Sequence, residues 1–225
     1  MTESRNDRER LSHKLQRLPL FPLYRVLLFP RALLPLYIFE PRYRELTAEC
    51  LAGNGLLAIA QLTPGFEANY HGRPKVRSMA GLGKIIAHRE NGDGTYNILL
   101  EGLGRVRIDE ELPPERSFRE VRAHLVRDRV AETLDQPAAL SYLRLLVETL
   151  AKGLGESGPS LRSLSTETKR LPCLVDVLSA ALVQQPGLRR RLFECRDLAA
   201  RSELLTVALA KLVADLKKPG DSELN

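Results

Sequence analysis

Basic side chains gather in two segments whose spacing could bind phosphate groups. The first segment is the densest basic run of the chain, and in the second basic residues alternate beside an aromatic ring. The two segments comprise Arg189, Arg190 and Arg191, and Tyr70, Arg73, Lys75 and Arg77. Guanidinium and ammonium groups pair with phosphates while a ring stacks on a base, so this pattern is typical of single-stranded nucleic-acid contacts. The first run also fits the solvated face of a short helix.

Three glycine-containing segments resemble nucleotide-binding or catalytic motifs, but each lacks a required residue. Gly81-Leu82-Gly83-Lys84 lacks the first glycine and the Ser or Thr of a phosphate-binding loop, and Gly102-Leu103-Gly104 lacks the third glycine of a dinucleotide motif. Gly155-Glu156-Ser157-Gly158 is one residue short of a nucleophile elbow and lies in a polar stretch. We therefore expect no catalytic residues and no cofactor. An enzyme with an unrecognised site is an alternative that no set of residues supports.

Neither the histidines nor the cysteines have the spacing of a metal site. No two histidines stand three or four residues apart, and no Cys-x-x-Cys occurs. These residues are His13, His71, His88 and His124, and Cys50, Cys173 and Cys195. We expect no metal and no disulfide framework, and hence free thiols in the cytoplasm.

The composition is that of a soluble globular protein. The chain has 225 residues, of which 44% are hydrophobic and 28% charged, with a net charge of +6 that is spread along the sequence. These values exclude collagen, a coiled coil and a wholly disordered chain. No apolar run reaches the roughly 20 residues that span a bilayer, and the first ten residues contain no apolar signal-peptide core. We therefore expect a cytoplasmic protein that does not bind membranes.

Residues 18–128 have the pattern of a β-rich subdomain with one helix. The prolines in LPLFPL at 18–23 favour an edge strand or an extended entry segment, because proline donates no ladder hydrogen bond. A helix is expected from Pro41 to Gly53, burying Tyr43, Leu46 or Thr47, and Cys50 or Leu51. A hairpin is expected at Asn91-Gly92-Asp93-Gly94. Further strands are predicted at 33–39, 56–62, 82–88, 95–100, 105–109 and 121–127, with a long loop at 63–78.

From residue 129 the hydrophobic period becomes helical. Three amphipathic helices are expected around 140–150, 174–182 and 205–216, with a short helix at 188–194 and an N-cap at Asp197. Residues 153–159 are expected to form a flexible link, and Pro186-Gly187 to end the second long helix. The helical subdomain is placed at 129–218, a polar extension at 1–17 and a tail at 219–225. Strands followed by helices imply two packed parts rather than an alternating βαβ sheet.

Several segments together resemble the N-terminal substrate-binding domain of Lon proteases. They are LPLFPL at 18–23, VLLFP at 26–30, LPLYIFEPRYR at 34–44, GLGKI at 81–85, and a hairpin from DGT at 93–95 to LEGLGR at 100–105. The resemblance covers about residues 18–216. It implies an α+β fold, with an N-terminal β-rich PUA-like pseudobarrel carrying one helix, followed by a C-terminal helical bundle.

The resemblance also implies a function without catalysis. No Walker motif and no Ser–Lys pair in a protease context is present, so the chain is expected to be a free-standing module that recognises polypeptides. Its expected partners are unfolded or exposed polypeptide segments and a separate protease or chaperone. Candidate peptide-binding residues are Phe39, Arg42, Tyr43, Phe66 and Tyr70. Phe39 and Tyr43, with Pro41, could instead fix a strand-to-helix corner, and Arg42 could instead pair locally or cap the backbone. The alternative is an RNA- or single-strand-binding protein that uses Arg73, Lys75, Arg77 and the 189–191 run.

Overall fold

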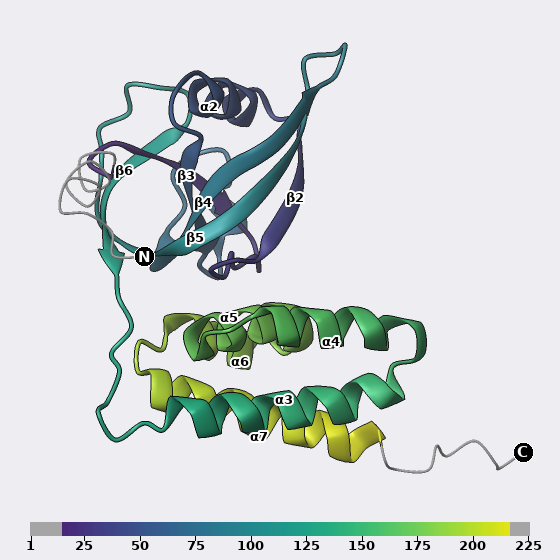
Figure 1. Ribbon diagram of the computed structural model, residues 1–225. Helices are drawn as coiled ribbons and strands as arrows, with labels where there is room; N and C mark the ends of the chain where they lie inside the picture. Colours follow the sequence, from purple (N-terminus) through teal and green to yellow (C-terminus); the bar gives the residue numbers. More distant parts are fainter. Residues whose placement is uncertain (1–14, 217–225) are drawn as a thin grey trace, which may run out of the picture. The chain divides into compact units, whose positions relative to one another are not determined.

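The computed structural model describes residues 15–216, which fold as two compact units that divide after Arg127 (Figure 1). Each unit is described by itself. Predictions for His13, for most of the polar extension and for the 219–225 tail lie outside the described residues.

Over residues 15–127 the N-terminal unit is a mixed sheet of six strands with one α-helix. The strands are β1 (Leu18–Leu23), β2 (Leu33–Ile38), β3 (Leu56–Leu62), β4 (Val76–Glu90), β5 (Tyr96–Glu111) and β6 (Arg119–Val126). Their order is β2-β5-β4-β3-β1-β6, and β5 pairs with β6 as well, so that five strands close into a ring with β2 attached to β5. Helix α2 (Pro41–Ala52) lies over one end of this ring (Figure 1). The α+β fold class with a near-closed β-rich ring, one helix and a following helical region is confirmed.

Strand β1 corrects the edge-strand prediction, because it lies inside the sheet between β3 and β6. It is parallel to β3, which makes the sheet mixed. Its pairing with β6 covers Leu18 to Leu20, and its pairing with β3 covers Leu20 to Leu23. Pro19 and Pro22 therefore each lie where only one neighbouring strand is paired. A proline costs a ladder bond only on the side to which its N–H would have pointed, so both are tolerated here.

Strand β5 joins two strands that were predicted to be separate. Its first half pairs with β2 and its second half with β6, and the change falls at Gly102–Gly104. A Cβ at Gly102 would lie 2.0 Å from the carbonyl oxygen of Phe29, and one at Gly81 would lie 2.4 Å from that of Leu28. These two glycines thus let the segment before β2 cross closely over the sheet, which is a structural role for the Gly-x-Gly motifs.

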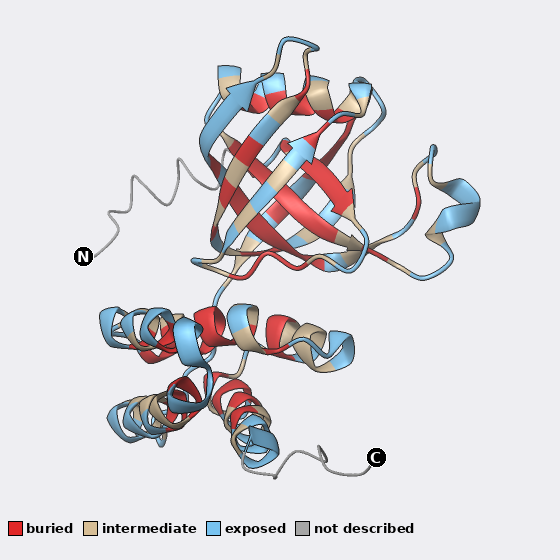
Figure 2. Cartoon of the chain, turned by 90° about the vertical axis from the view of Figure 1, so that its right-hand side faces the viewer, coloured by how far each residue is buried: buried red, intermediate tan, exposed pale blue. Residues whose placement is uncertain are grey.

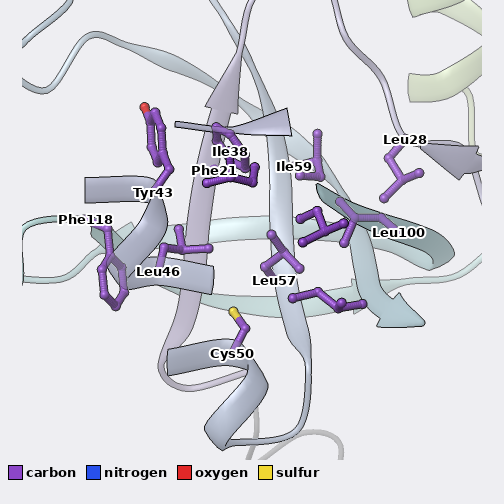
Figure 3. Close-up of a cluster of buried hydrophobic side chains, with 12 residues drawn as sticks. Phe21, Leu28, Ile38, Tyr43, Leu46, Cys50, Leu57, Ile59, Leu100 and Phe118 are labelled. Atoms are coloured by element: carbon purple, nitrogen blue, oxygen red, sulfur yellow. The ribbon is translucent and has the colours of Figure 1, made fainter. Parts of the chain in front are cut away.

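Helix α2 closes the main core of the N-terminal unit. Pro41 stands in its first turn and Gly53 at its end, as predicted, and its buried residues are Tyr43, Leu46, Thr47 and Cys50. They pack on the strand residues Phe21, Ile38 and Leu57 and on Phe118, which precedes β6 (Figure 3). A second cluster around Leu20, Ala58 and Val106 fills the ring. Figure 2 shows buried residues along most of the strands and in part of α2.

The described part of the C-terminal unit, residues 128–216, contains five α-helices: α3 (Gln136–Gly153), α4 (Gly158–Glu167), α5 (Leu171–Leu182), α6 (Pro186–Glu194) and α7 (Leu198–Leu216). The prediction of a flexible link at 153–159 was wrong at its C-terminal end, because Gly158 and Pro159 begin α4. Proline pre-sets the backbone of a first helical turn, and Leu161 and Ser165 provide a buried face. Pro186 similarly begins α6 rather than ending α5, which stops at Leu182.

The start of α7 is fixed by a cap and by a buried arginine. Asp197 accepts a hydrogen bond from the backbone N–H of Ala200 at 3.0 Å, so the predicted N-cap is confirmed. Arg201, one turn further, is completely buried and donates to both carboxylate oxygens of Asp128 and to the Cys195 carbonyl. This arginine therefore ties α7 to the first residue of the C-terminal unit.

Candidate functional site

Strand β2 presents a row of apolar side chains beside an unpaired strand edge. Leu33, Tyr37 and Phe39 are 60%, 56% and 61% exposed, whereas Ile38 is buried. Side chains alternate along a strand, so Leu33, Pro35 and Tyr37 share the outer face, and the rings of Tyr37 and Phe39 lie 6.0 Å apart. Among the described residues β2 pairs only with β5. We call Leu33, Pro35, Tyr37 and Phe39 the β2 strip.

Strand β5 extends the β2 strip. Pro35 lies opposite Leu99 and Leu33 opposite Glu101, and directly opposed residues of paired strands share a face. Leu99 is half-buried. On this outer face β5 therefore adds one apolar side chain beside the β2 strip, between the polar residues Asn97 and Glu101.

A cluster of aromatic rings lies where the long loop follows β3. The loop contains a single 3-10 turn, η1 (Phe66–Asn69), and its aromatic rings meet Tyr24. Phe66 lies 4.8 Å from the Tyr24 ring and 6.1 Å from the Tyr70 ring. The Tyr70 hydroxyl donates to Glu40 at 2.7 Å. Because Glu40 follows Phe39 in the chain, this aromatic cluster (Tyr24, Phe66 and Tyr70) adjoins the end of the β2 strip.

Tyr70 is held in place by its hydrogen bond to Glu40 and by the guanidinium group of Arg42. Arg42 pairs with Glu40 at 2.9 Å and stands 5.0 Å from the Tyr70 ring. Burial, together with the hydrogen bond to Glu40, raises the pKa of Tyr70 above its usual value. The phenol therefore stays protonated and keeps donating to Glu40 at neutral pH.

Tyr43 lies beneath Arg42 in the core. It is 5% exposed, its ring is 4.2 Å from that of Phe21, and the Arg42 guanidinium lies 4.6 Å above it. Burial raises the pKa of Tyr43 to about 12. Of the predicted peptide-binding residues, Phe39, Arg42, Phe66 and Tyr70 thus reach the surface in neighbouring places, and Tyr43 supports Arg42 from below.

The residues of the nucleic-acid alternative belong to different units. Arg73 pairs with Glu111 at 3.3 Å and donates to the Leu112 carbonyl. Arg189 donates to the carbonyls of Ala180 and Val183 at the end of α5, and burial lowers its pKa. Both side chains therefore have structural partners.

Lys75 and Arg191 are exposed, and Arg77 and Arg190 are half-buried. Arg190 and Arg191 line a groove between α6 and α7.

Two further features bear on function. Within residues 15–216, no three metal-ligating side chains come together. No helix in that range is both long and apolar enough to cross a bilayer.

Residues 17–211 match the family model described as the ATP-dependent protease La (LON) substrate-binding domain. The chain belongs to this Lon substrate-binding domain family. The match spans both units and includes the β2 strip and the aromatic cluster. The resemblance read from the sequence is therefore confirmed.

Curated relatives include two Lon proteases. The protein of Heliobacterium modesticaldum is 23% identical over 212 residues, covering 91% of this chain and 25% of the relative. The protein of Xanthomonas oryzae pv. oryzae is 24% identical over 189 residues, covering 84% and 22%. The chain thus spans about a quarter of the length of these Lon proteases.

Solved Lon domains have the same fold. The N-terminal domain of Mycobacterium avium complex Lon protease superimposes with a TM-score of 0.66 at 16% identity, covering 86% of this chain and 98% of that domain. The Lon N-terminal domain protein of Xanthomonas campestris gives a TM-score of 0.58 at 19% identity, covering 85% and 97%.

The comparisons match the chain to the substrate-binding domain of Lon. Of the β2 strip, sequence reasoning named Phe39 and missed the other residues. Leu33 and Tyr37 were assigned to a strand but not to a surface. The available signal was that both alternating faces of LLPLYI are apolar, although only one of them can face the core.

Proposed function

We propose that this protein is a non-catalytic module that recognises unfolded or exposed polypeptide segments. The observation that carries the proposal is the β2 strip, which places three large exposed apolar side chains along an unpaired strand edge. The Lon family's substrate-binding description supports the same role.

Recognition would use both the backbone and the side chains of β2. An extended polypeptide can add to a strand edge through backbone hydrogen bonds, which depend little on sequence. Its apolar side chains would cover Leu33, Tyr37 and Phe39 at the same time. Native proteins usually keep long apolar edges covered, so the exposure of this one favours a binding role. Such binding distinguishes unfolded from folded chains, because only unfolded chains offer a free extended segment.

The aromatic cluster would extend this surface. Phe66 and Tyr70 provide rigid rings whose immobilisation costs little entropy, and Arg42 holds Tyr70 in place. A bound segment leaving the end of β2 at Phe39 would meet these rings next. A polypeptide held in this way could then pass to a separate protease or chaperone. The three free cysteines support placing the protein in the reducing cytoplasm.

The test is a fluorescence-anisotropy titration with a labelled polypeptide that is reduced and carboxymethylated so that it stays unfolded. The double variant Tyr37→Thr/Phe39→Thr keeps strand propensity and removes both rings. Full burial of a large apolar side chain is worth about 1.5–3 kcal/mol, so covering the exposed part of each ring is worth about 1–2 kcal/mol. The double variant should therefore bind about 30-fold more weakly or worse.

The matched control is Tyr142→Ala, which removes a ring that is 50% exposed on α3. It should leave the affinity unchanged. Wild-type affinity in the double variant, or an equal loss in the control, would overturn the assignment to β2. The same titration with labelled single-stranded RNA tests the alternative. Saturable RNA binding that weakens steeply with salt, without polypeptide binding, would favour the basic segments instead.

A further inference from the structure

A small pocket of about 210 Å³ in the N-terminal unit is lined by four arginines. They come from three separate segments: Arg42 from α2, Arg73 from the long loop, Arg116 from the approach to β6 and Arg119 from its first position. Among the described residues, no acidic side chain lines the pocket. Ligand pockets for drug-sized molecules measure about 300–1,000 Å³, so this one suits a single residue or a smaller group.

Carboxylates outside the lining hold the four guanidinium groups in place. The guanidinium group of Arg116 donates hydrogen bonds to both carboxylate oxygens of Glu49, at 2.9 and 3.2 Å. Glu111 serves two cations, since it binds Arg119 at 2.6 Å and Arg73 at 3.3 Å. One carboxylate between two guanidinium groups cannot neutralise both, so positive charge is left facing the pocket.

Because Arg119 is buried, a second negatively charged partner for its guanidinium group would be favourable. Its side chain is 9% exposed, and its bonds to Glu111 and to the Pro74 carbonyl use three of its five N–H groups. Within residues 15–216, no other acceptor is bound to it. A partly buried guanidinium with donors to spare favours an oxyanion that can accept two parallel hydrogen bonds.

The floor of the pocket is apolar. It includes the core rings of Tyr43 and Phe118, which are 5% and 2% exposed and belong to the core cluster drawn in Figure 3. Arg42 lies 4.6 Å above the first ring, and Arg116 lies 5.9 Å from the second. A free phosphate would leave this floor unused, whereas a carboxylate attached to an apolar group would use both the floor and the rim.

We propose that this pocket binds the C-terminal carboxylate of a polypeptide whose last side chain is apolar. The carboxylate would lie inside the pocket against Arg73 and Arg119, which Glu111 pairs with from outside the lining, and the last side chain would lie on Tyr43 and Phe118. The proposal rests on the proposed function in that its ligand is a polypeptide. It concerns a different surface from the β2 strip and binds a chain end rather than an internal segment.

The test uses a fluorescein-labelled hexapeptide, Gly-Ser-Gly-Ser-Gly-Phe, with either a free C-terminal carboxylate or an amide. The free acid should bind at least tenfold more tightly than the amide. Arg73→Gln should weaken the acid about tenfold and leave the amide unchanged. The matched control is Arg122→Gln, because Arg122 also pairs with a glutamate in this unit but does not line the pocket. That control should bind as the wild type does.

Competition identifies the chemistry. N-Acetylphenylalanine should displace the peptide, whereas inorganic phosphate at the same concentration should displace much less. Equal affinity for acid and amide, full affinity in Arg73→Gln, or equal displacement by phosphate would each overturn the proposal.

The two proposals fail separately. If Tyr37→Thr/Phe39→Thr loses affinity for the unfolded polypeptide but the hexapeptide acid and amide bind equally well, only the pocket proposal is rejected. If the acid hexapeptide binds more tightly than the amide but the double variant binds the unfolded polypeptide as the wild type does, only the β2 strip proposal is rejected.

Discussion

Replacing Arg201 by methionine should destabilise the C-terminal unit more than any surface substitution in it. Arg201 is the largest of the fully buried side chains. Its guanidinium binds both oxygens of Asp128, at 2.7 and 2.6 Å, and the Cys195 carbonyl at 2.9 Å. Its Nε also faces the buried carboxylate of Asp176 at 3.6 Å. Although burial opposes the charged form, the bonds to Asp128 raise the pKa of Arg201 above its usual value, so the group stays charged.

The expected loss follows from these contacts. Methionine fills most of the aliphatic volume but removes the cation between two carboxylates, one of which is only 5% exposed. Breaking a buried ion pair by removing one partner costs about 3–5 kcal/mol. That is a large part of the about 5–15 kcal/mol that stabilises a typical domain. Adding Asp176→Asn to the methionine variant should restore part of the loss, because the carboxylate left behind is then uncharged.

The assay is urea unfolding followed by far-UV circular dichroism, which reports on the helices. Arg191→Met is the matched control, since Arg191 is exposed on α6, and it should change the free energy of unfolding by less than about 0.5 kcal/mol. Arg201→Lys keeps the charge but not the two-pronged geometry, and it should fall between the wild type and the methionine variant. A loss below about 1 kcal/mol in Arg201→Met would refute the reasoning. So would a further loss on adding Asp176→Asn.

Two other predictions concern the N-terminal unit. Gly102→Ala should lower the free energy of unfolding by more than about 1 kcal/mol, because the new methyl group would lie 2.0 Å from the Phe29 carbonyl oxygen. Gly104→Ala meets nothing within 4 Å and should have little effect, so equal urea midpoints would contradict the close crossing. Burial raises the pKa of Tyr43 from 10.0 to about 12, so the stability this gives is complete below pH 10 and is lost as the pH rises toward 12. Between pH 9 and pH 11.5 the melting temperature should decrease less steeply with pH for Tyr43→Phe than for the wild type. An equal decrease in both proteins would contradict this.

The local elements of the N-terminal unit could be predicted because their signals are local. The turn residues from Asn91 to Gly94 separate β4 from β5, and Gly94 has the positive φ of 74° that glycine tolerates. Pro41 and Gly53 bound α2, whose buried positions have the helical period. Each of these features depends on residues a few positions apart.

The errors occurred where distant segments decide the outcome. The prolines of β1 suggested an edge, but the offset of its two pairings makes an interior strand tolerable. Gly158-Pro159 suggested a link, but packing against α3 gives α4 its buried face.

The amino-acid order was enough to identify the fold class, the family and the absence of complete catalytic motifs. The fold class, the family and the motifs can be identified because periodicity and short motifs are each contained within one short stretch of the sequence. It could not show that Leu33, Tyr37 and Phe39 face outward, or that Arg73 and Arg119 converge on one pocket. The outward face of β2 depends on which of two apolar faces packs on the core. The pocket depends on contacts between three segments that are far apart in the sequence, and only the closed sheet brings those segments together.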